Sequence, residues 1–187
     1  MKEFLNSSKQ MIIAGNRGTG KTEYLKHLLA QERKHIVIDP NNEYQGYNRY
    51  VVEEPFILEK MQKEVDDLIT LISREGKIKF IAIDEANRVA PSLKNPPKTI
   101  AMLIDLQRHK GVKTVYITRR PVQLNANIHE LNDFYILFSL KGKNDIQFFN
   151  DIANGLGDAV AELDPDSFEY ILVQPNRTWK KMPPIKI

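Results

Sequence analysis

The segment GNRGTGKT at residues 15–22 fits the pattern GxxxxGKT, in which each residue type has a chemical purpose. The glycines permit positive φ angles and let successive backbone N–H groups turn toward one anion. Lys21 adds a charge that can reach between two phosphates, and the Thr22 hydroxyl can coordinate Mg²⁺. The segment therefore predicts a loop that holds the phosphates of ATP. The predicted ATP-binding residues are Gly15, Asn16, Arg17, Gly18, Thr19, Gly20, Lys21 and Thr22.

Two adjacent carboxylates, Asp84 and Glu85, follow the apolar run FIAI at residues 80–83. If this run is a strand, both acids lie at the carboxyl edge of the sheet, where open α/β sheets bind ligands. We expect Asp84 to hold Mg²⁺ through water and Glu85 to polarise the attacking water. An Asp-Glu pair after a strand also fits the start of a helix, where acids are favoured. The phosphate loop upstream favours the catalytic interpretation, and a glutamate there favours hydrolysis over transfer to a small acceptor.

Strand and helix patterns alternate along the chain and place both motifs at the ends of strands. Short apolar runs predict strands at residues 10–14, 35–38, 50–52, 78–83, 112–118, 133–140 and 168–174. Apolar residues at helical spacing predict helices at residues 21–31, 56–74, 98–110 and 145–154. This alternation is typical of βαβ units, so we predict an α/β fold with a mainly parallel sheet and helices on both faces. We expect one domain over residues 1–174, followed by a basic, Pro-containing tail over residues 175–187.

Four segments, in this order, resemble the FtsK/HerA superfamily of P-loop ATPases, which pump DNA. They are GNRGTGKT at residues 15–22, VIDPNNEY at 37–44, IDEANRVAP at 83–91 and LQRHKGVKTVYITRRP at 106–121. The first and third are shared by many ATPases, whereas the second and fourth make the combination specific. The resemblance covers about residues 10–174 and implies a RecA-like (ASCE) P-loop core that binds ATP and Mg²⁺. A bare core of this length is most similar to the compact viral genome-packaging ATPases.

The resemblance also assigns roles to residues of the fourth segment. Arg108 matches an arginine on the helix before Gly111 and is the candidate arginine finger for a neighbouring subunit's site. Thr118 matches the family's strand-ending threonine. The family usually has next a glutamine that senses the terminal phosphate, whereas this chain has Arg119. Either Arg119 faces the nucleotide and supplies positive charge there, or it lies in a surface turn and Thr118 alone must sense the phosphate. The rival fingers are Arg88, Arg119 and Arg120.

The turn after the second predicted strand leaves two interpretations open. Asp39 and Glu43, in VIDPNNEY, either orient the site beside the phosphate loop or belong to an ordinary surface turn. The residue types alone do not separate the two.

The net charge of +3 conceals blocks of opposite sign. The charge is −1 over residues 1–85, +7 over 86–143, −7 over 144–174 and +4 over 175–187. The positive block holds the candidate DNA-binding residues Arg88, Lys94 and Lys98, which would contact phosphates without regard to sequence. Solvated surface charge is the alternative. The chain has no cysteine and no apolar run long enough to span a membrane, so we expect a cytoplasmic protein, not an integral membrane protein.

These features predict an Mg-dependent ATPase subunit that translocates double-stranded DNA, as in a viral genome-packaging motor. The resemblance implies a homo-oligomeric ring, expected to be hexameric, with a viral membrane or capsid vertex protein as a further partner. One alternative is an ATPase that drives filamentous-phage-type virion assembly or secretion. Another is a nucleotide or small-molecule kinase, which would need a lid with paired arginines, and no lid insertion is obvious in the sequence.

Overall fold

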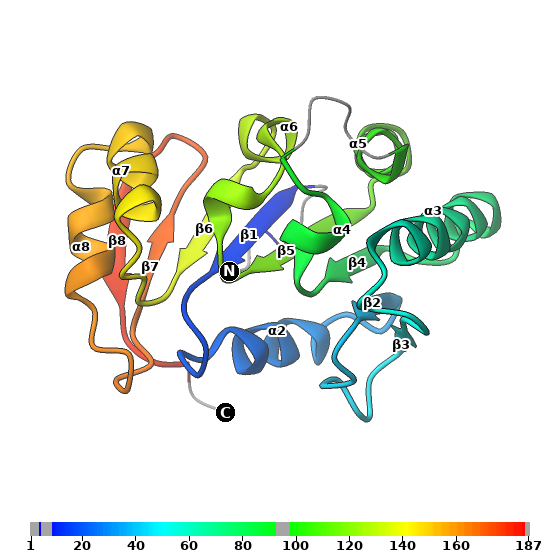
Figure 1. Cartoon of the computed structure of the whole chain (residues 1–187), viewed down its shortest axis with the longest axis horizontal. Coiled ribbons are helices and arrows are strands. Elements are labelled where there is room, and N and C mark those ends of the chain that lie inside the picture. Colours follow the sequence, from blue (N-terminus) through cyan, green and yellow to red (C-terminus); the bar gives the residue numbers. More distant parts are fainter. Residues whose placement is uncertain (1–3, 5–8, 93–97, 186–187) are drawn as a thin grey trace.

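The computed structural model describes residue 4, residues 9–92 and residues 98–185. In this part of the chain, one sheet has the strand order β3-β2-β4-β5-β1-β6-β7-β8 (Figure 1). The strands are β1 (Gln10–Ala14), β2 (His35–Asp39), β3 (Arg49–Val51), β4 (Phe80–Ile83), β5 (Lys113–Thr118), β6 (Phe134–Leu137), β7 (Tyr170–Val173) and β8 (Trp179–Met182). Strands β1 to β6 are mutually parallel, whereas β7 and β8 are antiparallel to their neighbours.

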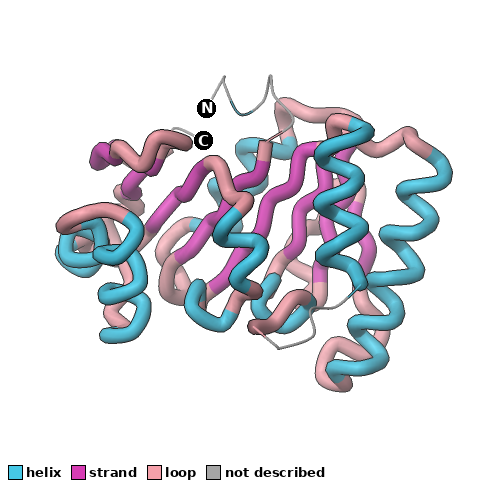
Figure 2. Tube along the Cα trace, turned by 90° about the horizontal axis from the view of Figure 1, so that it is seen from above, coloured by secondary structure: helices cyan, strands magenta, loops and turns pink. Residues whose placement is uncertain are grey.

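Helices cover both faces of this sheet, so its central strands are apolar on both sides. The helices are α2 (Lys21–Leu29), α3 (Leu58–Glu75), α4 (Ala86–Val89), α5 (Lys98–Lys110), the 3-10 turn η1 (Pro121–Gln123), α6 (Ala126–Glu130), α7 (Lys143–Ile152) and α8 (Leu156–Glu162). Along β1, Ile12 and Ala14 pack with α3, α5, α7 and α8, whereas Met11 and Ile13 pack with α2. Figure 2 looks onto the face that carries the larger set of helices. The predicted α/β fold with a mainly parallel sheet is therefore correct.

The sheet continues into the segment that the sequence suggested as a tail. Strand β8 has the sequence WKKM and pairs antiparallel with β7, with Trp179 opposite Val173. Two lysines on an outermost strand discourage the pairing of a further strand. They also interrupt the apolar run by which a strand is predicted from sequence. Helix α8 was not predicted either, because its seven residues, LGDAVAE, are too few to show a helical period.

None of the helices in the described ranges is both long and apolar enough to cross a lipid bilayer.

The buried His129 makes the stability of this fold depend on pH. Its Nε2 lies 2.9 Å from the Pro121 carbonyl oxygen, its Nδ1 lies 3.3 Å from the Tyr135 hydroxyl, and its ring packs edge-on against Phe148. Burial lowers the pKa of His129 to about 4, and the charge of Arg177 acts in the same direction. Since an unfolded histidine has a pKa of about 6.5, only the unfolded chain gains this proton at mildly acidic pH. The resulting stability is present above about pH 6.5 and is lost as the pH falls toward 4.

We expect the melting temperature of the wild type to fall more steeply between pH 7 and pH 5 than that of His129→Gln. The difference corresponds to about 2 kcal/mol over this interval. Comparing slopes removes any constant destabilisation by the substitution. Equal slopes for the two proteins would show that His129 takes up its proton in the folded state.

Candidate active site

The predicted phosphate loop connects β1 to α2 at the carboxyl edge of the parallel strands. Gly20 has φ of 104° and precedes the first residue of α2, so a residue with a side chain would be strained there. The backbone N–H groups of the loop thus lie beside the N-terminus of a nine-residue helix. Unpaired N–H donors and the helix dipole favour the binding of an anion there. This backbone is of the kind that phosphate binding requires.

The start of the loop is fastened to the segment that follows β6. A Cβ atom at Gly15 would lie 2.6 Å from the Cβ of Phe138, so only glycine fits under this residue. The backbone N–H of Asn16 donates to the Ser139 carbonyl oxygen at 2.9 Å. The loop is therefore positioned by a segment more than a hundred residues later in the chain.

Lys21 is almost completely buried, and its ammonium group bonds to the loop itself. Its Nζ donates to the Asn16 carbonyl oxygen at 2.6 Å, which also accepts from the Thr19 hydroxyl at 2.9 Å. Burial, together with the nearby Arg119 guanidinium, lowers the pKa of Lys21 to about 8. A lowered pKa means that the buried charge is unfavourable, and an anionic ligand such as a phosphate would stabilise it.

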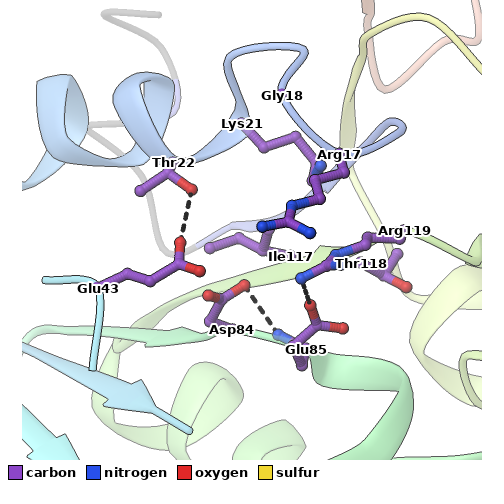
Figure 3. Close-up of a pocket in the computed structure, with 10 residues that line it drawn as sticks. All are labelled: Arg17, Gly18, Lys21, Thr22, Glu43, Asp84, Glu85, Ile117, Thr118 and Arg119. Carbon is purple, nitrogen blue, oxygen red and sulfur yellow. Dashed lines mark hydrogen bonds and ion pairs between the residues drawn. The ribbon is translucent and has the colours of Figure 1, made fainter. Parts of the chain in front are cut away.

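A cavity of about 240 Å³ lies between this loop and the carboxyl ends of β4 and β5 (Figure 3). Its lining brings cations from the loop, the start of α2 and the residue after β5 together with carboxylates that follow β4 and β2. The lining residues are Arg17, Gly18, Lys21, Thr22, Glu43, Asp84, Glu85, Ile117, Thr118 and Arg119. All of these lining residues except Ile117 were singled out by the sequence, and charges of both signs suit a polyanion that carries a metal ion.

Thr22 and Asp84 form the side of the cavity that suits a hard cation. Burial, to which Glu85 and Glu43 add their negative charges, raises the pKa of Asp84 to about 7. The Thr22 hydroxyl donates to Glu43 Oε2 at 3.3 Å. Carboxylate and hydroxyl oxygens are ligands that Mg²⁺ accepts, and a divalent cation would relieve the repulsion among these acids. The residues present therefore fit a magnesium ion.

Glu85 is held by an ion pair with Arg119. Its Oε1 lies 2.5 Å from Arg119 Nη2, and its backbone has φ of 48°, a left-handed conformation that side chains rarely adopt. Arg119 therefore does not lie in a turn away from the site but faces into the cavity, as Figure 3 shows. In this pair the Arg119 guanidinium occupies one oxygen of the Glu85 carboxylate, Oε1.

Asn87, a polar residue outside the predicted set, helps to organise this edge of the site. Thr118 Oγ1 donates to Asn87 Oδ1 at 2.9 Å and accepts from the Arg120 N–H at 3.0 Å. The side chain that the sequence assigned to sensing a phosphate is therefore fixed by hydrogen bonds. Asn87 was missed although it follows Glu85 by only two positions, because its partner is far away in the sequence.

The buried Asp39 shapes the turn that carries Glu43 to the cavity. Its carboxylate accepts from the backbone N–H groups of Glu43 and Tyr44 at 2.9 and 3.0 Å. Arg49 Nη1 donates to the same carboxylate at 3.2 Å. Of the two interpretations of VIDPNNEY, the geometry favours the first: Asp39 orders the turn, and Glu43 lines the site.

The remaining candidates lie outside this cavity. Arg108 is exposed in the last turn of α5, which leads into the start of β5 and so lies at the opposite edge of the sheet. Arg88, on α4, places its guanidinium 5.6 Å from the ring centre of Phe56. Lys98 is exposed at the start of α5, whereas Lys94 lies outside the described residues. Their roles with DNA or a neighbouring subunit stay predictions.

Comparison with known proteins identifies the fold through structure. No protein-family model matches the chain, and no curated protein matches it in sequence. The genome packaging NTPase B204 of Sulfolobus turreted icosahedral virus 2, in complex with ATP-gammaS, has a TM-score of 0.76 at 18% identity, covering 97% of this chain and 100% of that chain. The DNA-packaging ATPase B204 of Sulfolobus turreted icosahedral virus has the same TM-score and coverage at 19% identity.

A third solved structure is more distant. The N-terminal domain of zonular occludens toxin from Neisseria meningitidis has a TM-score of 0.61 at 14% identity, with 96% of each chain covered. At such identities the likeness establishes the fold. The chain thus has the P-loop NTPase fold, and its structural neighbours include viral packaging ATPases of the kind that its motifs resembled.

Proposed function

We propose that the chain is an ATPase subunit of a viral genome-packaging motor, which hydrolyses ATP with Mg²⁺ and moves double-stranded DNA. The observation that carries the proposal is the cavity in which Lys21 and Thr22 of the phosphate loop face Asp84 and Glu85. The likeness to B204 over nearly the whole of both chains supports it.

In this proposal each group of the cavity has a separate role in hydrolysis. The backbone N–H groups of the loop and Lys21 hold the phosphates. Thr22 and Asp84 would hold Mg²⁺, which neutralises charge on the phosphates when bound. A water oxygen attacks the terminal phosphorus, the bond to the ADP oxygen breaks, and Glu85 accepts the proton of the water. Positive charge on Arg17 or Arg119 would stabilise the charge that develops on the transferred group.

The ion pair between Glu85 and Arg119 adds a condition to this scheme. Arg119 occupies Glu85 Oε1, and the terminal phosphate would offer the guanidinium a second anion in the same cavity. We infer that binding of the triphosphate draws Arg119 from Glu85 and so frees the carboxylate. The exchange needs only side-chain rotation, because both groups already line the site.

The distance of Arg108 from its own cavity fits a role between subunits. From the opposite edge of the sheet, its side chain can reach a nucleotide only in a neighbouring copy. We therefore propose Arg108 as the arginine finger of a homo-oligomeric ring, with a hexamer as the expected form.

The experiment that tests the motor function is the ATPase rate with and without double-stranded DNA across a salt series. We expect stimulation by DNA at about 50 mM salt that weakens strongly by about 200 mM, since contacts to phosphates release counterions. Lys98→Ala should reduce the stimulation, whereas Lys77→Ala, another exposed lysine, should not.

Other outcomes of this experiment separate the alternatives. ATP hydrolysis without DNA stimulation at low salt would favour an ATPase that moves protein during virion assembly or secretion. Phosphate release that required an added small acceptor would favour a kinase.

A further inference from the structure

A second cavity, of about 170 Å³, lies beside the phosphate loop and has no part in the hydrolysis scheme above. Most of its lining is aromatic or aliphatic, and it comes from the loop, from the segment after β6, from β7 and its approach, and from the segment after β8. The lining residues are Gly20, Glu23, Phe138, Phe168, Tyr170, Pro184 and Ile185. The two cavities share the first turn of α2, because Lys21 and Thr22 line one while Gly20 and Glu23 line the other.

Packed aromatic rings make one wall of this second cavity rigid. Phe138 and Tyr170 are buried, with ring centres 5.7 Å apart, and both pack against Tyr24 of α2, at 6.0 and 5.1 Å. These rings form an apolar surface beside the N-terminus of the helix.

Phe168 stands out because it is both strained and exposed. Its φ of 55° is a genuine outlier for a bulky residue, yet half of its side chain stays accessible to solvent. An unstrained backbone would be expected if this ring served only to fill the core. Strained residues with exposed side chains are typical of ligand sites.

The position of Phe168 relates this cavity to the phosphates. A Cβ atom at Gly20 would lie 3.3 Å from Phe138 Cε1 and 3.3 Å from Phe168 Cδ1, so both rings touch the last glycine of the loop. A nucleotide with its terminal phosphates at Lys21 must extend along one side of this turn. Toward Asp84 and Glu43 it would meet carboxylates, whereas toward Phe168 it meets aromatic surface.

We propose that this second cavity binds the base of the nucleotide, stacked on Phe168 and flanked by Pro184 and Ile185. The inference rests on the proposed function, because it takes the loop to hold a nucleoside triphosphate. Few polar side chains line the cavity: the Glu23 carboxylate is paired with Lys26 at 2.8 Å, and the Tyr170 hydroxyl interacts with Tyr24. Stacking therefore outweighs hydrogen bonding to the base edges, and the site accepts purine nucleotides in general.

The test is calorimetric titration of the full chain with Mg²⁺ and ADP, GDP or inorganic tripolyphosphate, which has no base. Phe168→Gly removes the ring and also relieves the left-handed backbone, so this variant should melt at or above the wild-type temperature. We expect it to bind ADP and GDP about tenfold more weakly, as removal of one stacking ring does, with tripolyphosphate affinity unchanged. Phe168→Trp should retain ADP binding. Phe56→Ala, which removes another exposed aromatic ring, should alter none of the three.

Each further outcome contradicts a defined part of the inference. Unchanged ADP affinity in Phe168→Gly, or an equal loss for tripolyphosphate, would show that the base lies elsewhere. A large preference of the wild type for ADP over GDP would overturn recognition by stacking. If the wild type bound none of the three ligands, the proposed function itself would fail. If the wild type hydrolysed ATP and Phe168→Gly had the same KM for ATP, the proposed base site would be wrong while the proposed function would stand.

Discussion

Glu85→Gln is expected to bind ATP with nearly wild-type affinity and to hydrolyse it at least about 10²-fold more slowly, the usual effect of losing a general base. The amide keeps the shape of the side chain and can still accept a hydrogen bond from Arg119, so the cavity should stay intact. What it cannot do is take a proton from water. Single-turnover hydrolysis, measured beside equilibrium binding of ATP, separates the two effects.

The matched control for this variant is Glu54→Gln, which changes an exposed carboxylate paired with Lys60 far from the cavity. It should bind and hydrolyse ATP as the wild type does. Wild-type turnover in Glu85→Gln would remove the assignment of Glu85 as the base and leave hydrolysis to another group of the cavity.

Lys21→Ala is expected to lose nucleotide binding and hydrolysis together, with kcat/KM reduced by roughly 10²–10³ or more, as when one donor to a developing charge is removed. In the absence of nucleotide, the substitution should leave the stability of the folded protein unchanged or increase it. The wild-type protein buries this ammonium group, and burial lowers the pKa of Lys21 to about 8, so the charge is unfavourable without an anion. The Asn16 carbonyl oxygen keeps its bond from Thr19 after the substitution.

Thermal melting with and without Mg-ATP tests both halves of this prediction. Without nucleotide, Lys21→Ala should melt at the same temperature as the wild type or higher. With nucleotide, only the wild type should shift upward, because a ligand that binds the folded state stabilises it. Lys60→Ala is the control, since it removes an exposed lysine on α3. A nucleotide shift that survives in Lys21→Ala would contradict the role of this residue.

The features that the sequence predicted correctly are those set by local pattern. The apolar runs of β1, β2, β4 and β5 end at polar motifs, and parallel strands bring such ends to one edge. The amino-acid pattern alone is therefore enough to place GNRGTGKT and Asp84-Glu85 near one another. The basic strand β8 and the short α8 lack these patterns, because pairing with β7 and packing against α7 stabilise them.

Side-chain partners within the site were harder to predict. The ion pair between Glu85 and Arg119 joins the ends of two adjacent strands, and nothing near either residue specifies which way its side chain turns. The cavity beside Gly20 combines the loop with Phe168 and Ile185, segments about 150 positions apart. Such contacts follow from tertiary structure and leave no local signal.

The place of β1 at the centre of the sheet has a consequence for biosynthesis. Strand β1 pairs with β5 and β6, which follow it by about a hundred residues and are therefore made later. Contacts over such separations form slowly, and the nascent chain must carry the apolar QMIIA segment without a partner meanwhile. Ile185, which lines the cavity beside Gly20, is made later still. We therefore expect nucleotide to assist folding only after β5 and β6 have been made, so that a chain truncated before β5 does not bind ATP.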